Sequence, residues 1–365
     1  MSEYDRVAVL MMIKNEEKII KKTLDSVKRF PLVLVFDTGS VDDTILIVES
    51  YPNTKVHKGE FVDFSTSRNE LLSLAEKEVV KEDYLLLLDA GDEFRPLDEE
   101  KPFDFSSESA LYLVPQVWET GNLNRYFNTR MFKNNHGFRY KGKVHEYLDR
   151  GGECKGAAPP SKKMETFELY QDRRGDKAAS SVKRWKKDLE ILKKEVKNNP
   201  NSTRDLFYLA QTYECLQNRK MAYQTYKRRS KIREIGFYEE VFISLMRCGQ
   251  NADCWEKSIS WYMKAFNFIK RAEPLLKIAE HYQVEKDFHR SWLFIKMACE
   301  LEYPKQCILF VDSDAYSYKR WHLLGIVSYY VGKFEDGKTG CLRAIEAKKG
   351  LKIDCENLAF YEQQS

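Results

Sequence analysis

Hydrophobic and polar positions change their spacing halfway along the chain. In the first half, nearly uninterrupted apolar runs at residues 7–13, 32–36 and 84–88 alternate with stretches of helical periodicity. Such runs are typical of strands that are covered on both faces, and a short strand is predicted near 55–58. Helices are predicted over about 14–29, 43–51 and 64–81. This alternation predicts an α/β domain with a Rossmann-like, mostly parallel sheet.

Polar clusters follow three of these predicted strands, at residues 14–17, 37–44 and 89–93. Carboxyl ends of parallel strands lie along one edge of an open sheet, and ligands bind there. The sequence therefore predicts that the three clusters meet at one ligand-binding edge.

The second half has the spacing of tetratricopeptide repeats, which are helical hairpins of about 34 residues. Small residues recur at Ala210, Ser244, Ala279 and Gly325, with aromatic and further small residues at the expected distances after them. The fourth repeat comes late, so residues 300–318 are expected to hold extra structure. The pattern predicts an all-α array with a concave groove.

Composition agrees with two units that have different partners. The chain has 365 residues, which favours two domains. Residues 1–160 carry 22 Lys and Arg against 28 Asp and Glu, whereas residues 161–365 carry 38 against 28. Residues 162–197 hold 12 of these basic residues, and 176–199 read as a basic amphipathic connecting helix. A solvated helix face, an anionic acceptor or a membrane surface would each explain this charge. Nucleic acid is disfavoured, because no base-reading module accompanies it.

The remaining sequence signals favour the cytoplasm, free or at a membrane surface. No apolar stretch reaches 18 residues, so no transmembrane segment is expected. The N-terminus lacks the features of a secretory signal. The eight cysteines form no CxxC pair, so free thiols are expected.

Four motifs in order carry a resemblance to a known family. They are KNEE, DTGSVDDT, DFSTSRNELLSLA and DAGDEF, each placed after or between predicted strands. Together they resemble family 2 glycosyltransferases of the GT-A fold. NTRMFKNN and GKVHEYL resemble a branch with Val-His-Glu near the end of the catalytic domain, and FYLAQTY and RAEPL resemble its tetratricopeptide-containing members. The implied organisation is a catalytic domain at 1–165, a basic linker helix at 166–200 and helical repeats at 201–365.

The resemblance implies a nucleotide-sugar donor, with a UDP-sugar favoured. Asp37 would accept the imide N–H of uracil, Asn15 and Glu16 would line the base pocket, and Asp89 would lie near the ribose. Arg68 and Asn69 would approach the nucleotide or its diphosphate. Read by itself, Arg68 fits a surface salt bridge equally well.

A diphosphate also needs positive charge, and Mn²⁺ or Mg²⁺ prefers oxygen ligands. Asp92 and Glu93 are the predicted metal ligands, and by resemblance His145 completes the metal or diphosphate site. Family members commonly have Asp-x-Asp here, whereas this chain has one residue more between Asp89 and Asp92. This leaves open which carboxylate touches the metal.

Glu146 and Arg130 are the predicted catalytic residues of an inverting hexosyl transfer. The resemblance implies that Glu146 deprotonates the acceptor, and which carboxylate serves as the base stays open. The acceptor would be a glycan, a peptide or a protein, and the basic second half allows an anionic one. Trp118 and Glu119 fit an acceptor lid less well than a packed aromatic beside a turn.

Two other functions stay open. The chain could be a non-catalytic tetratricopeptide scaffold whose nucleotide-sugar domain has degenerated. For either function, the helical repeats could form a homodimer. A nucleotidyltransferase fits less well, because the first strand is followed by MIKNEE rather than by a glycine-rich loop.

Overall fold

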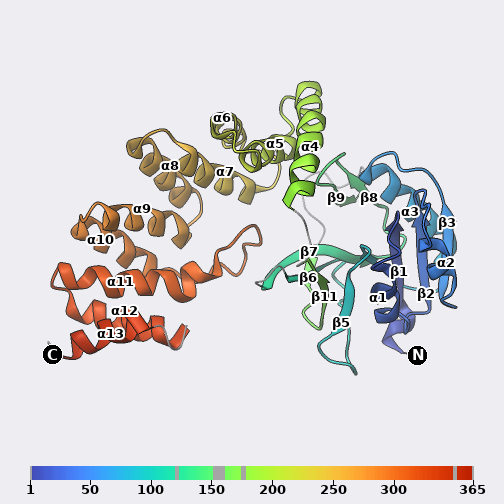
Figure 1. Cartoon of the computed structure of the whole chain (residues 1–365), viewed down its shortest axis with the longest axis horizontal. Helices are drawn as coiled ribbons and strands as arrows, with labels where there is room; N and C mark the ends of the chain where they lie inside the picture. The colour runs from blue at the N-terminus through green and yellow to red at the C-terminus, as the bar shows by residue number, and fades with distance from the viewer. Residues whose placement is uncertain (1, 120–122, 151–160, 174–177, 348–351, 364–365) are drawn as a thin grey trace. The chain divides into compact units, whose positions relative to one another are not determined.

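The computed structural model describes residues 2–119, 123–150, 161–173, 178–347 and 352–363 (Figure 1). The chain divides into two compact units, Met1–Ser181 and Val182–Ser365. The first unit is built around a sheet and the second is all-helical, as the sequence predicts.

A mixed sheet forms the centre of the first unit, with the strand order β3-β2-β1-β4-β7-β6-β11-β5 and with β10 beside β6. The strands are β1 (Val7–Ile13), β2 (Leu32–Asp37), β3 (Thr54–Lys58), β4 (Tyr84–Leu88), β5 (Glu93–Pro96), β6 (Leu111–Glu119), β7 (Leu123–Lys133), β10 (Ser161–Lys163) and β11 (Phe167–Asp172). The first four strands are parallel, whereas β7 runs antiparallel to β4 and β6. A separate antiparallel pair joins β8 (Phe138–Lys141) and β9 (Tyr147–Arg150).

Apolar side chains fill both faces of the sheet, which explains the uninterrupted runs in the sequence. Val7, Val9 and Met11 belong to one buried cluster, and Ala8 and Leu10 belong to the other. The first cluster is covered by α1 (Ile20–Ser26) and α2 (Thr44–Glu49), and the second by α3 (Phe64–Glu78). A short 3₁₀ turn, η1 (Glu3–Arg6), precedes β1.

Two local predictions are wrong. The first helix begins at Ile20 rather than at residue 14, because the N–H groups of residues 15–17 donate to side chains of the next loop. Residues 167–172, assigned from sequence to a linker helix, form β11 between β6 and β5. Phe167 and Leu169 bury their side chains there completely, so packing decides the strand.

Helical hairpins make up the second unit. After α4 (Ala178–Asn198), which crosses the boundary between the units, the neighbours pair as α5 with α6, α7 with α8, α9 with α10, and α11 with α12. Their bounds are α5 Thr203–Cys215, α6 Arg219–Arg229, α7 Tyr238–Asn251, α8 Trp255–Phe268, α9 Ala272–Val284, α10 Phe288–Cys299, α11 Arg320–Tyr330, α12 Phe334–Ala347 and α13 Lys352–Glu362. The four small anchor residues are all buried in the first helices of these hairpins, which is the packing that the repeat spacing predicts.

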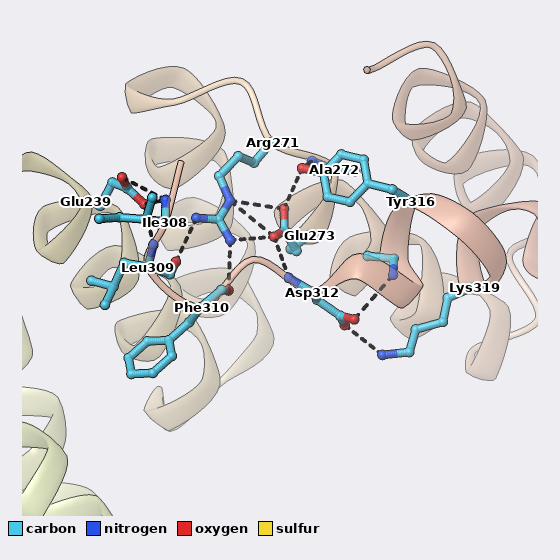
Figure 2. A network of polar contacts seen from close by, with 11 residues as sticks. Glu239, Arg271, Ala272, Glu273, Ile308, Leu309, Phe310, Asp312, Tyr316 and Lys319 are labelled. Carbon is cyan, nitrogen blue, oxygen red and sulfur yellow. Dashed lines mark hydrogen bonds and ion pairs between the residues drawn. The ribbon is translucent and has the colours of Figure 1, made fainter. Parts of the chain in front are cut away.

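The predicted insertion between the third and fourth hairpins is present, and a buried ion pair fastens it (Figure 2). Arg271 pairs with Glu273 and donates hydrogen bonds to the carbonyls of Leu309 (3.2 Å) and Phe310 (2.9 Å). The carboxylate of Glu239 accepts the N–H of Leu309 at 2.7 Å. The segment ends in a π-helical turn, η2 (Ala315–Lys319), that leads into α11. Side chains therefore supply the partners that this irregular backbone lacks.

Two other expectations concern cysteines and membranes. The seven cysteines in the described ranges are unpaired, and Cys154 lies outside those ranges. Over the same ranges, the helices include none with both the length and the apolar character of a membrane span.

Candidate active site at the carboxyl ends of β1, β2 and β4

The three predicted polar clusters lie at the same edge of the sheet. β1 pairs with β2 on one side and with β4 on the other, all in parallel, with Ile13 opposite Asp37 and Met11 opposite Leu88. The loops after these strands therefore leave the sheet side by side, as the strand and cluster positions predict.

Hydrogen bonds tie the first two loops together. The N–H of Asn15 donates to Ser40 Oγ at 2.9 Å, and Asn15 Oδ1 accepts the N–H of Val41 at 2.8 Å. Asn15 has a left-handed backbone with a φ of 56°, a conformation that asparagine tolerates better than most residues. The buried carboxylate of Asp37 accepts the N–H groups of Gly39 and Ser40. Asp37 thus stabilises its own turn, and its predicted contact with the nucleobase stays a prediction.

Glu16 connects these loops to the third cluster. Burial, together with the negative charges of Asp42 and Asp89, raises the pKa of Glu16 to about 6. The N–H of Glu16 also donates to Thr44 Oγ1 at 2.7 Å. Carboxylates from all three loops therefore interact at this edge.

Asp89, directly after β4, is held by two guanidinium groups. Arg68 Nη2 lies 2.9 Å from Oδ1, and Arg130 Nη2 lies 2.5 Å from Oδ2. Burial by itself would raise the pKa of Asp89, but the charges of Arg130 and Arg68 outweigh it and hold the pKa well below its ordinary value. Asp89 is therefore ionised at neutral pH.

A β-bulge places Arg130. The pairing of β6 with β7 jumps from Tyr112–Met131 to Leu113–Thr129, so Arg130 has no residue opposite it. Bulges redirect side chains and are common beside active sites. Arg130 is 8% exposed, and its charge is compensated by Asp89 and by the nearby Asp92.

Arg68 joins the site to the Val-His-Glu segment. Its Nε donates to Glu146 Oε1 at 3.0 Å, and its guanidinium carbon lies 5.4 Å from the ring centroid of Tyr140. The adjacent Asn69 uses both ends of its amide on the backbone of Tyr140, at 2.7 and 2.9 Å. Asn69 therefore fastens β8 beneath Arg68, and its predicted contact with the donor stays a prediction.

The three predicted metal ligands, Asp92, Glu93 and His145, have different surroundings. Asp92 is 1% exposed, and its Oδ2 accepts the N–H of Asp89 at 2.9 Å. Burial and the charge of Asp89 raise the pKa of Asp92 to about 6, against the opposing charge of Arg130. Glu93 pairs with Arg95 at 3.0 Å, and His145 has a left-handed backbone with a φ of 53°.

Within the described ranges, no three His, Cys, Asp or Glu side chains are grouped as metal ligands. Asp92, Glu93 and His145 thus do not form a preassembled triad. Mg²⁺ is usually held by one or two carboxylates together with substrate phosphates. Asp89 and Asp92 fit this requirement for one or two carboxylates, since a cation would offset the burial and the repulsion by Asp89 that raise the pKa of Asp92.

Three buried polar atoms around Asp89 lack a hydrogen-bond partner: Arg68 Nη1, Arg130 Nε and the hydroxyl of Tyr140. An unsatisfied buried donor costs about 1–3 kcal/mol. All three groups can donate a hydrogen bond, so the cluster is suited to a ligand rich in anionic oxygen.

Sequence reasoning identified Arg68, Asp89, Arg130 and Glu146 singly but not as one cluster. It missed Tyr140, because a single aromatic residue in a short strand gives no sequence signal for a site. It also missed the bulge, because a bulge depends on which residues of the neighbouring strand are paired. The sequence signal that located the site best was the pair of carboxylates, Asp89 and Asp92, directly after a buried strand.

Comparisons with known proteins found a family model, a curated relative and solved structures to which the chain is similar. Residues 8–164 match the family model described as "Glycosyl transferase family 2". A TPR repeat-containing protein of Synechococcus elongatus is 27% identical over 148 residues, which are 40% of this chain and 36% of that protein. The chain thus spans about a third of the length of this curated relative.

Solved structures similar to the chain include the C-terminal part of a TPR repeat-containing protein from Cytophaga hutchinsonii. The TM-score is 0.39 at 13% identity, over 50% of this chain and 68% of that one. A thermophilic TPR protein of Thermus thermophilus gives a TM-score of 0.29 at 16% identity, over 51% and 94%. Residues 8–164 of the chain are a glycosyltransferase family 2 domain, and tetratricopeptide-like helical repeats follow it.

Proposed function

We propose that the protein is an inverting glycosyltransferase that moves a sugar from a nucleotide-sugar donor, with a UDP-sugar favoured, to an acceptor hydroxyl. The observation that carries this proposal is the pairing of two buried arginines, Arg68 and Arg130, with the partly exposed Asp89 at the carboxyl ends of the strands of a family 2 domain. Two guanidinium groups with unsatisfied donors suit the diphosphate of such a donor.

The nucleoside would lie over the tied loops after β1 and β2. Asn15, Glu16 and Asp37 are fixed there by backbone hydrogen bonds, so the pocket would need little ordering on binding. The carboxylate of Asp37 already accepts two backbone N–H groups. To bind the base, one of its oxygens would accept a further hydrogen bond from the base.

In the reaction, the acceptor oxygen forms a bond to the anomeric carbon while the bond from that carbon to the diphosphate breaks. Glu146 would take the acceptor's proton on its carboxylate, which Arg68 orients through Oε1. Arg68 and Arg130 would stabilise the charge of the departing diphosphate. Asp92, with Asp89, would hold Mn²⁺ or Mg²⁺, which when bound supplies further positive charge to the leaving group.

Thermal unfolding with a panel of nucleotide-sugars tests the proposal. A ligand that binds the native state raises the melting temperature by mass action, so one donor should protect the chain more than the rest, with Mn²⁺ enhancing the protection. That donor should also be hydrolysed slowly. Absence of protection and of nucleotide release with the whole panel would contradict the proposal.

The runner-up is a non-catalytic scaffold that binds nucleotide. It is favoured by one observation: both oxygens of Asp89 are already satisfied by arginine. Protection by a nucleotide, without hydrolysis or transfer at any metal concentration, would support the scaffold over the enzyme.

A further inference from the structure

The face formed by β6 and β7 changes character as these strands run away from the core. Tyr112 and Val114 of β6 belong to the apolar cluster on this face. The next residues on the same face are Gln116 and Trp118, because side chains alternate along a strand. Tyr126 lies opposite Gln116, and Asn128 lies opposite Val114. A buried apolar face thus continues as an amide and aromatic one.

A buried glutamine organises this face. Gln116 is 1% exposed, and its Oε1 accepts the hydroxyl of Tyr126 at 3.0 Å and the amide of Asn128 at 2.9 Å. A polar side chain in a strand interior contributes little by packing, yet here it fixes two neighbouring side chains in one arrangement. The exposed Asn128 is therefore preorganised by a residue that solvent does not reach.

The aromatic part of the face is also held in place. The rings of Trp118 and Tyr126 meet edge to face with centroids 4.9 Å apart, and the guanidinium of Arg173 lies 4.4 Å from the Trp118 ring. The indole N–H of Trp118 is buried and has no hydrogen-bond partner. It is a donor for which a ligand could supply the acceptor.

This face adjoins the donor cluster. Gln171 of β11 lies beside Trp118 in the sheet, and its side chain is so close to Gly91 that a Cβ there would lie 3.3 Å from Nε2. Gly91 has a φ of 92° in the loop that joins Asp89 to Asp92. Burial raises the pKa of the Tyr126 phenol, and the charges of Asp92 and Asp89 add to the rise against the effect of Arg130. Gln171 therefore joins this face to the loop that carries the donor carboxylates, and Tyr126 is near enough to feel their charge.

We propose that Trp118, Tyr126, Asn128 and Gln171, organised by Gln116, bind a sugar residue of the acceptor next to the donor site. This inference rests on the proposed function and names its acceptor class as a carbohydrate. An amide offers both a donor and an acceptor, which matches a sugar hydroxyl, and aromatic rings cover the apolar C–H faces of a pyranose. A protein or lipid acceptor would not need this combination of two amides and two aromatics.

The test follows the indole N–H resonance of Trp118 by NMR in the full chain, assigned with Trp118→Phe. The probes are the methyl glycosides of glucose, galactose, mannose and N-acetylglucosamine. At least one should shift the Trp118 resonance, with a dissociation constant on the order of 1 mM. Asn128→Ala should weaken that binding tenfold or more. Thr129→Ala, whose side chain lies on the opposite face of β7, should leave it within twofold.

UDP is titrated in the same samples, so that the two proposals fail separately. UDP binding without any response of Trp118 to the glycosides overturns the acceptor face and leaves the proposed function standing. A response of Trp118 to a glycoside without UDP binding supports the acceptor face and contradicts the proposed UDP-sugar donor. A response that is equal in Asn128→Ala and in the wild type, or one given by a Gly-Ser peptide and not by glycosides, also overturns the acceptor face.

Discussion

Asp89 and Asp92 are three residues apart and have opposite electrostatic surroundings. Two arginines stabilise the charge of Asp89, whereas burial and the neighbouring carboxylate oppose the charge of Asp92. Glu93 is paired with Arg95. From these differences we expect the carboxylates of one loop to have separate roles, which can be tested residue by residue.

Asp92→Ala should reduce metal-dependent transfer roughly a thousandfold, because a lost metal ligand removes several kcal/mol of transition-state stabilisation. Glu93→Gln should stay within a few-fold of the wild type, since Arg95 already engages that carboxylate. Initial rates at several Mn²⁺ concentrations measure both. Equal losses in the two variants would return Glu93 to the metal site.

Glu16→Gln should stabilise the protein at neutral pH. The pKa of Glu16 rises from its ordinary value of 4.5 to about 6 on folding, so the folded state binds more protons between these values and its stability falls as pH rises through them. Above pH 6 the penalty is below about 2 kcal/mol, because solvent screens this half-buried carboxylate. The glutamine avoids it, so its advantage should be small at pH 4.5 and should grow up to pH 6.

Urea unfolding at pH 4.5, 6 and 7.5 checks this prediction for Glu16→Gln against Glu49→Gln, which changes an exposed carboxylate of α2. The same advantage at all three pH values would mean that the variant acts through packing and not through ionisation.

At the scale of elements, irregular segments are fixed by side chains and not by regular pairing. A bulge in β7 directs Arg130, Asn69 fastens β8, and Arg271 with Glu273 fastens the insertion before α11. Each of these side chains forms a hydrogen bond or an ion pair with a backbone group or a charged group that would otherwise lack a partner. Their loss should therefore be felt locally.

Arg271→Met should destabilise the second unit by about 3–5 kcal/mol, because it leaves Glu273 buried without its partner. The amide N–H groups of residues 308–312 should then exchange with solvent faster than those of α9. Arg343→Met, at an exposed pair on α12, is the matched control and should change stability by less than about 1 kcal/mol. Unchanged exchange at 308–312 would mean that the insertion is held by its apolar contacts instead.

At the scale of the whole molecule, the two units differ in architecture and in charge. The first carries the glycosyltransferase family 2 domain and all the proposed donor contacts. The second is a helical array with its own apolar core. Because each unit has its own core, a fragment that contains the whole first unit should fold by itself.

A fragment of residues 1–181 should fold and bind nucleotide, whereas one of residues 1–165 should not fold stably. The shorter fragment lacks β11, whose Phe167 and Leu169 each contribute about 2 kcal/mol by burial. Circular dichroism and calorimetric titration with UDP compare the two. If 1–181 is folded but does not bind UDP, the second unit contributes to the donor site.

The sequence determined the features that depend on local spacing. Apolar runs marked β1, β2 and β4, and polar clusters marked the edge that carries the candidate site. Small residues at Ala210, Ser244, Ala279 and Gly325 marked the hairpins. These features follow from periodicity, which a single chain displays directly. The motif order was likewise enough to indicate the family.

Only the tertiary structure decided how the site is assembled. Arg68, Arg130 and Glu146 are separated from their partners by 21, 41 and 78 residues. Arg130 reaches Asp89 because one residue of β7 is left unpaired, and Gln116 orders Asn128 because two strands align in one register. Contacts of this kind depend on strand pairing across the sheet, and the spacing of residues within one segment carries no record of that pairing.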